Sequence, residues 1–270
     1  MSYRQKIDSL FDLTGKSALV TGGASGLGRD VASALAVRGA RVAITSRSEA
    51  SAQAAAGELE LLTGGKFSGY SLDLTAPESL EQCHRQIQES FGDITILVNN
   101  AGGTPAEPRR NFLERPAEAV REMLEINVLG LMEMSRLFAI GMAERGYGKI
   151  INIASVAALV GRDRRLYART GLPPQPVDYA AAKGAVVALT RDMAAALAPQ
   201  GVRVNAISPG GFERRQPKAF IDGYSELTAL GHMGQSPFDL AGAAIFLASP
   251  ASDYVTGENL VVDGGFVGFK

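Results

Sequence analysis

The chain has 270 residues, of which 46% are hydrophobic, and its 27 basic and 28 acidic side chains give a formal net charge of −1. This balance provides no general field that would recruit nucleic acid or an anionic membrane, so we expect small molecules as partners. A single cysteine, Cys83, excludes an internal disulfide, and two histidines, His84 and His232, are too few for a metal-ligand cluster. We therefore predict no metal site.

The N-terminal segment lacks the long apolar core of a signal peptide, and we identify no apolar stretch that approaches the length needed to span a bilayer. A cytoplasmic location without membrane partners is the expectation that follows. No linker-like stretch, repeat or low-complexity tract divides the sequence. We therefore predict a single domain over residues 1–270.

Apolar runs alternate with helical stretches along the whole chain. Helices are predicted near residues 27–38, 50–61, 77–91, 118–138 and 180–198. Strands are predicted near residues 17–21, 41–45, 67–72, 94–98, 148–153, 202–207 and 259–262. Repeated alternation of strand and helix indicates an α/β fold with a parallel sheet and helices on both faces. Ligands of such sheets bind beyond the carboxyl ends of the strands.

A glycine-rich turn joins the first predicted strand to the first of these helices. Gly22, Gly26 and Gly28 stand where the turn must be tight and where the backbone must approach a bound pyrophosphate. The helix that begins near Leu27 would direct its first N–H groups at that phosphate. A strand before the turn and a helix after it favour a dinucleotide site over a turn that binds nothing.

The end of the second predicted strand bears on the choice of cofactor. An acidic residue there would bind the ribose hydroxyls of NAD, but this chain has Ser46 and Arg47. Arginine can bind the 2′-phosphate of NADP, whereas Glu49 is better placed to open the next helix. We predict NADP, with NAD as the alternative; a solvated surface arginine is the structural alternative for Arg47.

The segment DYAAAKGAV places Tyr179 four residues before Lys183, which puts both side chains on one face of a helix. There the ammonium would favour the phenolate and lower the tyrosine pKa toward neutrality, as a general acid or base requires. The same spacing occurs by chance in many helices. Its significance here comes from the glycine-rich turn in the same chain.

Together these features resemble the short-chain dehydrogenase/reductase family, and the segment LFDLTGKSALVTG resembles members described as gluconate 5-dehydrogenase-like. The matching motifs extend over nearly the whole chain: Thr21-Gly22-x-x-x-Gly26-x-Gly28, Asp73, Asn99–Gly102, Asn127, Ser155, Tyr179-x-x-x-Lys183, Asn205 to Gly210 and Val262 to Gly265. The resemblance implies one doubly wound Rossmann domain with a seven-stranded parallel sheet. It also implies a homo-oligomer, either a dimer or a tetramer.

The same resemblance implies the roles of the site residues. Tyr179 would be the acid in reduction and the base in oxidation, Lys183 would stabilise its phenolate, and Ser155 would hydrogen-bond the substrate oxygen. Asn127 would hold a water that links Lys183 to solvent. Cofactor contacts are expected from Gly22, Ser25, Gly26, Leu27, Gly28, Arg47, Asp73, Leu74, Asn99, Ala101, Gly102, Tyr179, Lys183, Pro209 and Gly210. Ordinary turn, cap or helix-interior positions are the alternatives for Ser155, Asn127, Asp73, Pro209 and Gly210.

Two segments depart from the pattern of the family or extend it. Relatives usually have a shorter segment than the 23 residues between Ser155 and Tyr179, and we expect the extra length, about 160–176, to lie at the mouth of the active site. This segment contains four arginines: Arg162, Arg164, Arg165 and Arg169. They either bind a carboxylate or phosphate of the substrate, or they only keep a loop soluble or bind a neighbouring subunit.

Resemblance implies a mobile lid at about 211–234. Its candidate substrate contacts are Arg214, Arg215, Tyr224 and His232. The segment lacks the threonine that many relatives place a few residues after the Pro-Gly pair.

The sequence thus predicts an NAD(P)-dependent oxidoreductase that interconverts a secondary alcohol and a ketone, on a sugar acid or polyol. The enzymatic alternative is a 3-oxoacyl thioester reductase, which would use the same catalytic residues on a more apolar substrate. A non-catalytic dinucleotide-binding regulatory protein is the alternative of another class. The presence of Ser155, Tyr179 and Lys183 argues against it.

Overall fold

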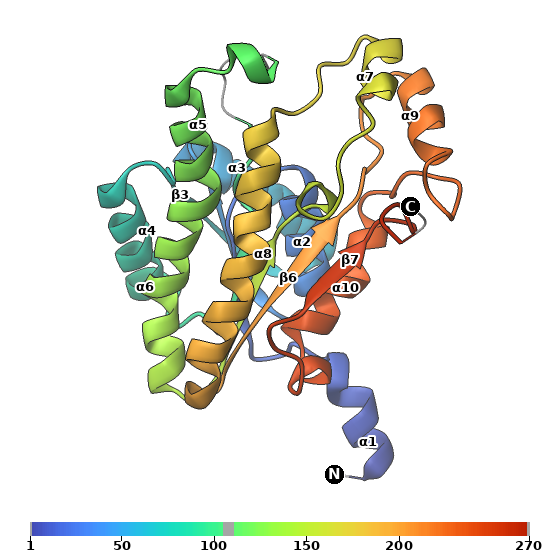
Figure 1. The fold of residues 1–270 in the computed structure, drawn as a ribbon. Coiled ribbons are helices and arrows are strands. Elements are labelled where there is room, and N and C mark those ends of the chain that lie inside the picture. Colours follow the sequence, from blue (N-terminus) through green and yellow to red (C-terminus); the bar gives the residue numbers. More distant parts are fainter. Residues whose placement is uncertain (1, 105–110, 269–270) are drawn as a thin grey trace.

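The computed structural model describes residues 2–104 and 111–268, which build a seven-stranded sheet (Figure 1). Every neighbouring pair of strands is parallel, and the order is β3-β2-β1-β4-β5-β6-β7. The strands are β1 (Ser17–Val20), β2 (Arg41–Ser46), β3 (Lys66–Ser71), β4 (Ile96–Asn99), β5 (Gly148–Ile153), β6 (Val202–Pro209) and β7 (Asn259–Val262). The predicted doubly wound fold is confirmed, and the order reverses between β1 and β4, where a crevice forms at the carboxyl ends.

All seven predicted strands are present, and their ends differ from the predicted ones by no more than two residues. The reason is visible in β1, where every residue is buried. Ala18 and Val20 belong to the core on one face of the sheet, whereas Leu19 belongs to the core on the other. Strands buried on both faces read as continuous apolar runs, which makes them easy to find.

Helices cover both faces of the sheet (Figure 1). The core that contains Val20 is completed by α2 (Gly26–Val37), α3 (Glu49–Thr63) and α10 (Phe238–Ala248). The opposite core is completed by α4 (Pro77–Ser90), α6 (Gly130–Glu144) and α8 (Val177–Leu197). Cys83 is buried in this second core, and its burial raises the pKa of the thiol to about 12. Among the described residues, no group of histidine, cysteine or carboxylate side chains could hold a metal ion.

The helix predicted near 118–138 is a run of three elements over residues 117–144. A π-helical turn, Glu125–Leu129, joins α5 (Ala117–Leu124) to α6. An 18-residue window of this run has a mean hydropathy of 1.3, so the run is long and apolar enough to cross a membrane by length and composition, and the prediction that no stretch approaches this length is wrong. Met134 and Phe138 are buried against the sheet, as in a core helix of a globular protein.

Two short helices lie side by side above the carboxyl ends of the strands (Figure 1). The extra segment between Ser155 and Tyr179 contains α7 (Arg164–Thr170), and the segment predicted as a lid contains α9 (Lys218–Ser225). Leu166 of α7 packs in one cluster with Phe220 and Tyr224 of α9. At the other end of the molecule, α1 (Tyr3–Asp8) buries no residue and stands away from the sheet.

Candidate active site

A cleft of about 1110 Å³ lies at the carboxyl ends of the central strands. It extends from the glycine-rich turn at the start of α2 to the segment around α7 and α9. Most of the predicted site residues line it: Gly22, Ser25, Gly26, Leu27, Arg47, Asp73, Leu74, Ala101, Gly102, Ser155, Tyr179, Lys183, Pro209 and Gly210. Gly28, Asn99 and Asn127 do not.

The glycine-rich turn has the geometry of an anion site. Gly22 and Gly26 have φ values of +64° and +58°, a region that residues with a side chain rarely adopt. Ser25 is the N-cap of α2 but makes no side-chain capping hydrogen bond, so the helix presents its first N–H groups to the cleft without one. A pyrophosphate fits this turn, because oriented N–H groups and the helix dipole both favour an anion.

Gly28 has a packing role. A Cβ at this position would come within 2.5 Å of the carbonyl oxygen of Gly22, and closer still to the amide of Asn100. That amide donates 2.9 Å and 3.4 Å hydrogen bonds to the carbonyls of Thr21 and Gly22. The absence of a side chain on Gly28 therefore lets α2 pack directly against the end of β4.

Asn99 and Asn100 have opposite environments although they are neighbours. The Asn99 side chain is turned into the core, where its amide donates to Ser135 Oγ at 2.8 Å and Asn152 Oδ1 at 2.9 Å. Asn100 lines the cleft with Ala101 and Gly102. The side chain of Asn99 thus connects β4 with β5 and α6 below the site. The asparagine that lines the cleft is Asn100, which sequence reasoning missed.

Two arginines lie at the glycine-rich end of the cleft. Arg47 follows β2 and is exposed at the rim, as its predicted role requires. Arg214 comes from the segment after β6, and its guanidinium nitrogens lie 3.2 and 3.3 Å from the position that a Cβ on Gly26 would occupy. We predicted Arg214 as a substrate contact, but the structure places it beside the anion site of the glycine-rich turn.

The structure brings Ser155, Tyr179 and Lys183 together in the middle of the cleft. Tyr179 lies on α8, and Ser155 follows β5, where its Oγ also accepts a 3.1 Å hydrogen bond from the N–H of Ala157. The Lys183 ammonium lies 5.8 Å from the centroid of the Tyr179 ring and donates a 2.8 Å hydrogen bond to the carbonyl of Ile153. Ser155, Tyr179 and Lys183 therefore line the same part of the cleft, and Ser155 hydrogen-bonds with Tyr179.

Burial shifts the pKa values of both Tyr179 and Lys183. Burial raises the pKa of Tyr179, and hydrogen bonds with Ser155 and Gln175 and the charge of Arg162 oppose that rise without cancelling it. Burial also lowers the pKa of Lys183 to about 8. We expected Lys183 to lower the pKa of Tyr179, but in the ligand-free protein the tyrosine pKa is raised, and the cation that opposes the rise is Arg162.

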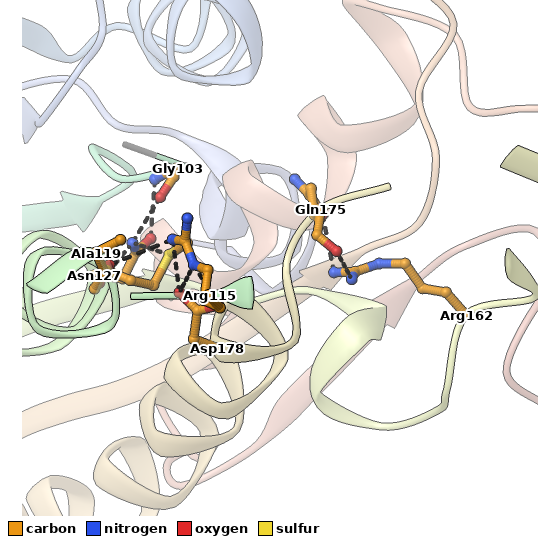
Figure 2. Close-up of polar contacts among 8 residues, drawn as sticks. Gly103, Arg115, Ala119, Asn127, Arg162, Gln175 and Asp178 are labelled. Atoms are coloured by element: carbon orange, nitrogen blue, oxygen red, sulfur yellow. Dashed lines mark hydrogen bonds and ion pairs between the residues drawn. The ribbon is translucent and has the colours of Figure 1, made fainter. Parts of the chain in front are cut away.

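Asn127 lies in the π-helical turn, a feature often found at functional sites. Its side chain accepts a 2.9 Å hydrogen bond from the N–H of Gly103 and donates to the carbonyls of Gly103 at 2.8 Å and Met123 at 2.9 Å (Figure 2). A Cβ on Gly102 would lie 2.7 Å from Asn127 Oδ1 and 3.6 Å from Lys183 Nζ. Asn127 therefore holds the loop after β4 close to Lys183, and its water-holding role stays a prediction.

A buried ion pair beside Tyr179 was not predicted. Arg115 donates from Nη2 to Asp178 Oδ2 at 2.9 Å and from Nε to both carboxylate oxygens at 3.2 and 3.3 Å (Figure 2). Asp178 lies in the first turn of α8, directly before Tyr179. The sequence gives no local signal for the pair, because 63 positions separate its members.

The other end of the cleft is built by the extra segment and the segment predicted as a lid. Arg162 is the one arginine of the four in the extra segment that lines the described cleft. Tyr224 also lines it, but its hydroxyl accepts a 2.7 Å hydrogen bond from the N–H of Gly211, and its ring stacks on Phe266. Arg215 and His232 lie outside the residues that line the cleft.

Known proteins are similar to this chain over almost its whole length. A family model described as enoyl-(acyl carrier protein) reductase matches residues 22–267. The 3-oxoacyl-(acyl-carrier-protein) reductase FabG of Vibrio cholerae is 38% identical over 94% of this chain and 98% of its own. A short-chain type dehydrogenase/reductase from Mycobacterium marinum is 35% identical with a TM-score of 0.85, covering 98% of this chain and 99% of its own. A gluconate 5-dehydrogenase from Burkholderia cenocepacia, solved with NADP and tartrate, is 34% identical with a TM-score of 0.86, covering 96% and 98% of the two chains.

Proposed function

The chain belongs to the short-chain dehydrogenase/reductase family, and we propose that it interconverts a secondary alcohol and a ketone on a sugar acid or polyol, with NADP as the preferred cofactor. The observation that carries the reaction is the convergence of Ser155, Tyr179 and Lys183 in a cleft that begins at an anion-binding glycine-rich turn. The relative solved with NADP and tartrate supports the substrate class and the cofactor.

The residues of the chain divide the chemistry between them. A bound nicotinamide would supply the hydride chemistry, as the acceptor for the carbinol carbon in oxidation and the donor to the ketone carbon in reduction. Tyr179 takes the hydroxyl proton in oxidation and gives it back in reduction. Ser155 donates a hydrogen bond to the substrate oxygen. Lys183, whose ammonium lies 5.8 Å from the centroid of the Tyr179 ring, stabilises the phenolate.

Cofactor binding is assigned to the turn, to the two arginines and to the strand ends. Gly22, Ser25, Gly26 and Leu27 would receive the pyrophosphate, with Arg214 beside Gly26 as its cation. Arg47 would bind the 2′-phosphate. Asp73 and Leu74 flank the adenine end, where the Asp73 carboxylate accepts hydrogen bonds from the backbone and side chain of Thr75. The remaining contacts are proposed for Ala101, Gly102, Lys183, Pro209 and Gly210, which line the other half of the cleft.

Initial rates at 340 nm test this function directly. The purified protein is offered NADP and NAD in turn with sugar acids, polyols and simple secondary alcohols. Turnover of a sugar acid or polyol, faster with NADP, is the expected result. Absence of turnover across the panel would contradict the substrate class.

Reduction of a 3-oxoacyl thioester is the second candidate. It is favoured by the FabG relative and by an apolar wall of the cleft, formed by Val156, Val160, Leu166, Leu172 and Leu227. NADPH oxidation with a 3-oxoacyl thioester, in the absence of sugar-acid turnover, would select it. A non-catalytic regulatory protein would bind NADP and turn over neither substrate.

We also propose that the whole chain acts as one domain in a cytoplasmic homo-oligomer, a dimer or a tetramer, with residues 211–234 as the lid. Apolar side chains on α6 support the assembly, since Leu129, Met132 and Ile140 in and before this helix are 50%, 44% and 51% exposed. Light scattering coupled to gel filtration measures the subunit number. A monomer at all concentrations would contradict this part of the proposal.

A further inference from the structure

The extra segment between Ser155 and Tyr179 is packed in place above the site. Its helix α7 contacts α9 of the proposed lid, where a Cβ on Gly223 would lie 2.6 Å from Leu166. The two helices therefore approach as closely as glycine allows. After α7 the segment reaches the cleft again at Gln175, which lines it.

Gln175 is fixed by its backbone as well as by its side chain. It directly precedes Pro176, the N-cap of α8, and a residue before proline is restricted to extended backbone conformations. Its carbonyl accepts a 3.1 Å hydrogen bond from Arg162 Nη1, and its Oε1 accepts a 2.9 Å hydrogen bond from Arg162 Nη2 (Figure 2). The two ends of the extra segment thus meet at this glutamine.

The side-chain amide of Gln175 hydrogen-bonds with both Arg162 and Tyr179. Because its oxygen accepts from Arg162, its nitrogen is the atom that can donate. Burial raises the pKa of Tyr179, and the hydrogen bond with Gln175 opposes that rise. A bond with this effect favours the phenolate, so the amide donates its N–H to the Tyr179 oxygen.

Two other groups beside Tyr179 have different tasks in the proposed reaction. Ser155 hydrogen-bonds with Tyr179 in the ligand-free protein, but its hydroxyl is assigned to the substrate oxygen. Lys183 donates a 2.8 Å hydrogen bond to the carbonyl of Ile153 and would act on the phenolate through its charge. Gln175 is therefore placed to keep a hydrogen bond to the Tyr179 oxygen while a substrate is bound.

Several elements bring titratable or charged side chains to the described cleft around Tyr179. They are Lys183 on α8, Arg162 and Asp163 in the extra segment, Tyr167 on α7, Tyr224 on α9 and Glu122 on α5. The carboxylates of Asp163 and of Asp178, at the start of α8, are each paired with an arginine, at 2.8 and 2.9 Å. The charge of Arg162, whose Cζ lies 5.4 Å from the centroid of the tyrosine ring, opposes the rise of the tyrosine pKa in the same direction as the amide.

We propose that the side-chain amide of Gln175, oriented by Arg162, is a further catalytic group of this site, which donates a hydrogen bond to the Tyr179 oxygen and stabilises the phenolate. In alcohol oxidation the hydroxyl proton passes to this phenolate, while the N–H proton stays on the amide. The guanidinium polarises the amide through its oxygen, which strengthens the N–H as a donor. The assignment rests on the proposed function, in which Tyr179 is the acid and base, and it gives the extra segment a part in proton transfer.

Tyrosinate absorbance measures this effect without a substrate. The full chain in complex with NADP⁺ is titrated with base, and the same titration of Tyr179→Phe is subtracted to isolate one of the seven tyrosines. Gln175→Ala, with Gln175→Ala/Tyr179→Phe as its reference, should move the midpoint of Tyr179 to higher pH, because the phenolate loses a donor. Gln175→Glu should move it further, since a carboxylate keeps the contact with Arg162 but replaces the N–H donor by a negative charge.

Gln53→Ala is the matched control, because it makes the same change at an exposed position on α3. The midpoint of Tyr179 should not change in this variant. An unchanged midpoint in Gln175→Glu would overturn the assignment. So would a wild-type Tyr179 that does not titrate before the complex unfolds.

The pH profile of alcohol oxidation, with D-gluconate and NADP⁺, separates this role from a structural one. Below the midpoint, Gln175→Ala should oxidise about three- to tenfold more slowly than wild type, and the difference should vanish above both midpoints, where the phenolate forms without the donor. A loss of the same size at every pH would show that Gln175 only positions Tyr179. Failure of the proposed function is recognised separately, as absent turnover of the whole panel by wild type, while the absorbance titration still decides the role of Gln175.

Discussion

Arg115 and Asp178 form an ion pair whose side chains are only 4% and 7% exposed, with 2.9 Å between Nη2 and Oδ2. Arg115 Nη2 also lies 3.3 Å from the carbonyl of Ala119, to which it donates. The pair joins the start of α8 to the segment that precedes α5. Its acidic member, Asp178, lies one residue before Tyr179. The position of the proposed catalytic tyrosine therefore depends on a contact outside the cleft.

Replacement of Arg115 by alanine should destabilise the protein strongly. The carboxyl group of Asp178 would be left buried without its partner, a change that costs about 3–5 kcal/mol. Urea unfolding followed by circular dichroism measures the loss. Arg121→Ala is the control, because Arg121 pairs with Glu118 at the surface, where such pairs contribute about 0–1 kcal/mol. Equal losses in the two variants would contradict the structural role of the buried pair.

Replacement of Lys183 by methionine should stabilise the ligand-free protein at neutral pH while it abolishes turnover. Burial lowers the pKa of Lys183 from 10.5 to about 8, so below pH 8 the folded state carries the full cost of a buried ammonium. Between pH 8 and 10.5 the unfolded chain binds more protons, and wild-type stability rises with pH. The advantage of the variant should therefore shrink over this window.

Urea unfolding at pH 7, 8 and 9 measures that advantage. Lys66→Met is the control, because it makes the same change at an exposed position on β3. An advantage of Lys183→Met that does not change with pH would show that packing, and not the buried charge, is responsible.

Replacement of Tyr179 by phenylalanine should lower kcat by at least 10²-fold, since general acid–base catalysis typically contributes about 10²–10⁴-fold. The ring, and with it the packing on α8, is retained, so NADPH should bind as to wild type. Tyr147→Phe is the control, because Tyr147 lies outside the cleft and its buried hydroxyl has no hydrogen-bond partner within the described part of the chain. Unchanged kcat in Tyr179→Phe would exclude Tyr179 as the proton donor.

Arg47 and Arg214 should affect cofactor binding differently. Arg47→Ala removes the proposed partner of the 2′-phosphate and should weaken NADPH about tenfold but leave NADH unchanged, since only NADPH carries that group. Arg214 lies beside Gly26, so Arg214→Ala should weaken both cofactors to a similar extent through the shared pyrophosphate. Fluorescence titrations with NADPH and NADH give the four dissociation constants. The same selectivity in both variants would contradict one of the two assignments.

The sequence alone determined the features that depend on local patterns. Buried parallel strands are continuous apolar runs, so all seven could be predicted to within two residues. The glycine-rich turn is recognised from its spacing between a strand and a helix, and Tyr179 and Lys183 share a helix face because they are four positions apart. These relations are fixed by the backbone over a few residues.

The sequence could not determine relations set by packing. Asn99 was selected as a cleft residue in place of Asn100, because β4 extends one residue beyond its predicted end and alternate residues of a strand face opposite sides. Arg214 meets Gly26, and Arg115 meets Asp178, only because helices and crossovers bring distant segments to the same end of the sheet. Burial, which raises the pKa of Tyr179 and lowers that of Lys183, likewise exists only once the chain has folded around both side chains.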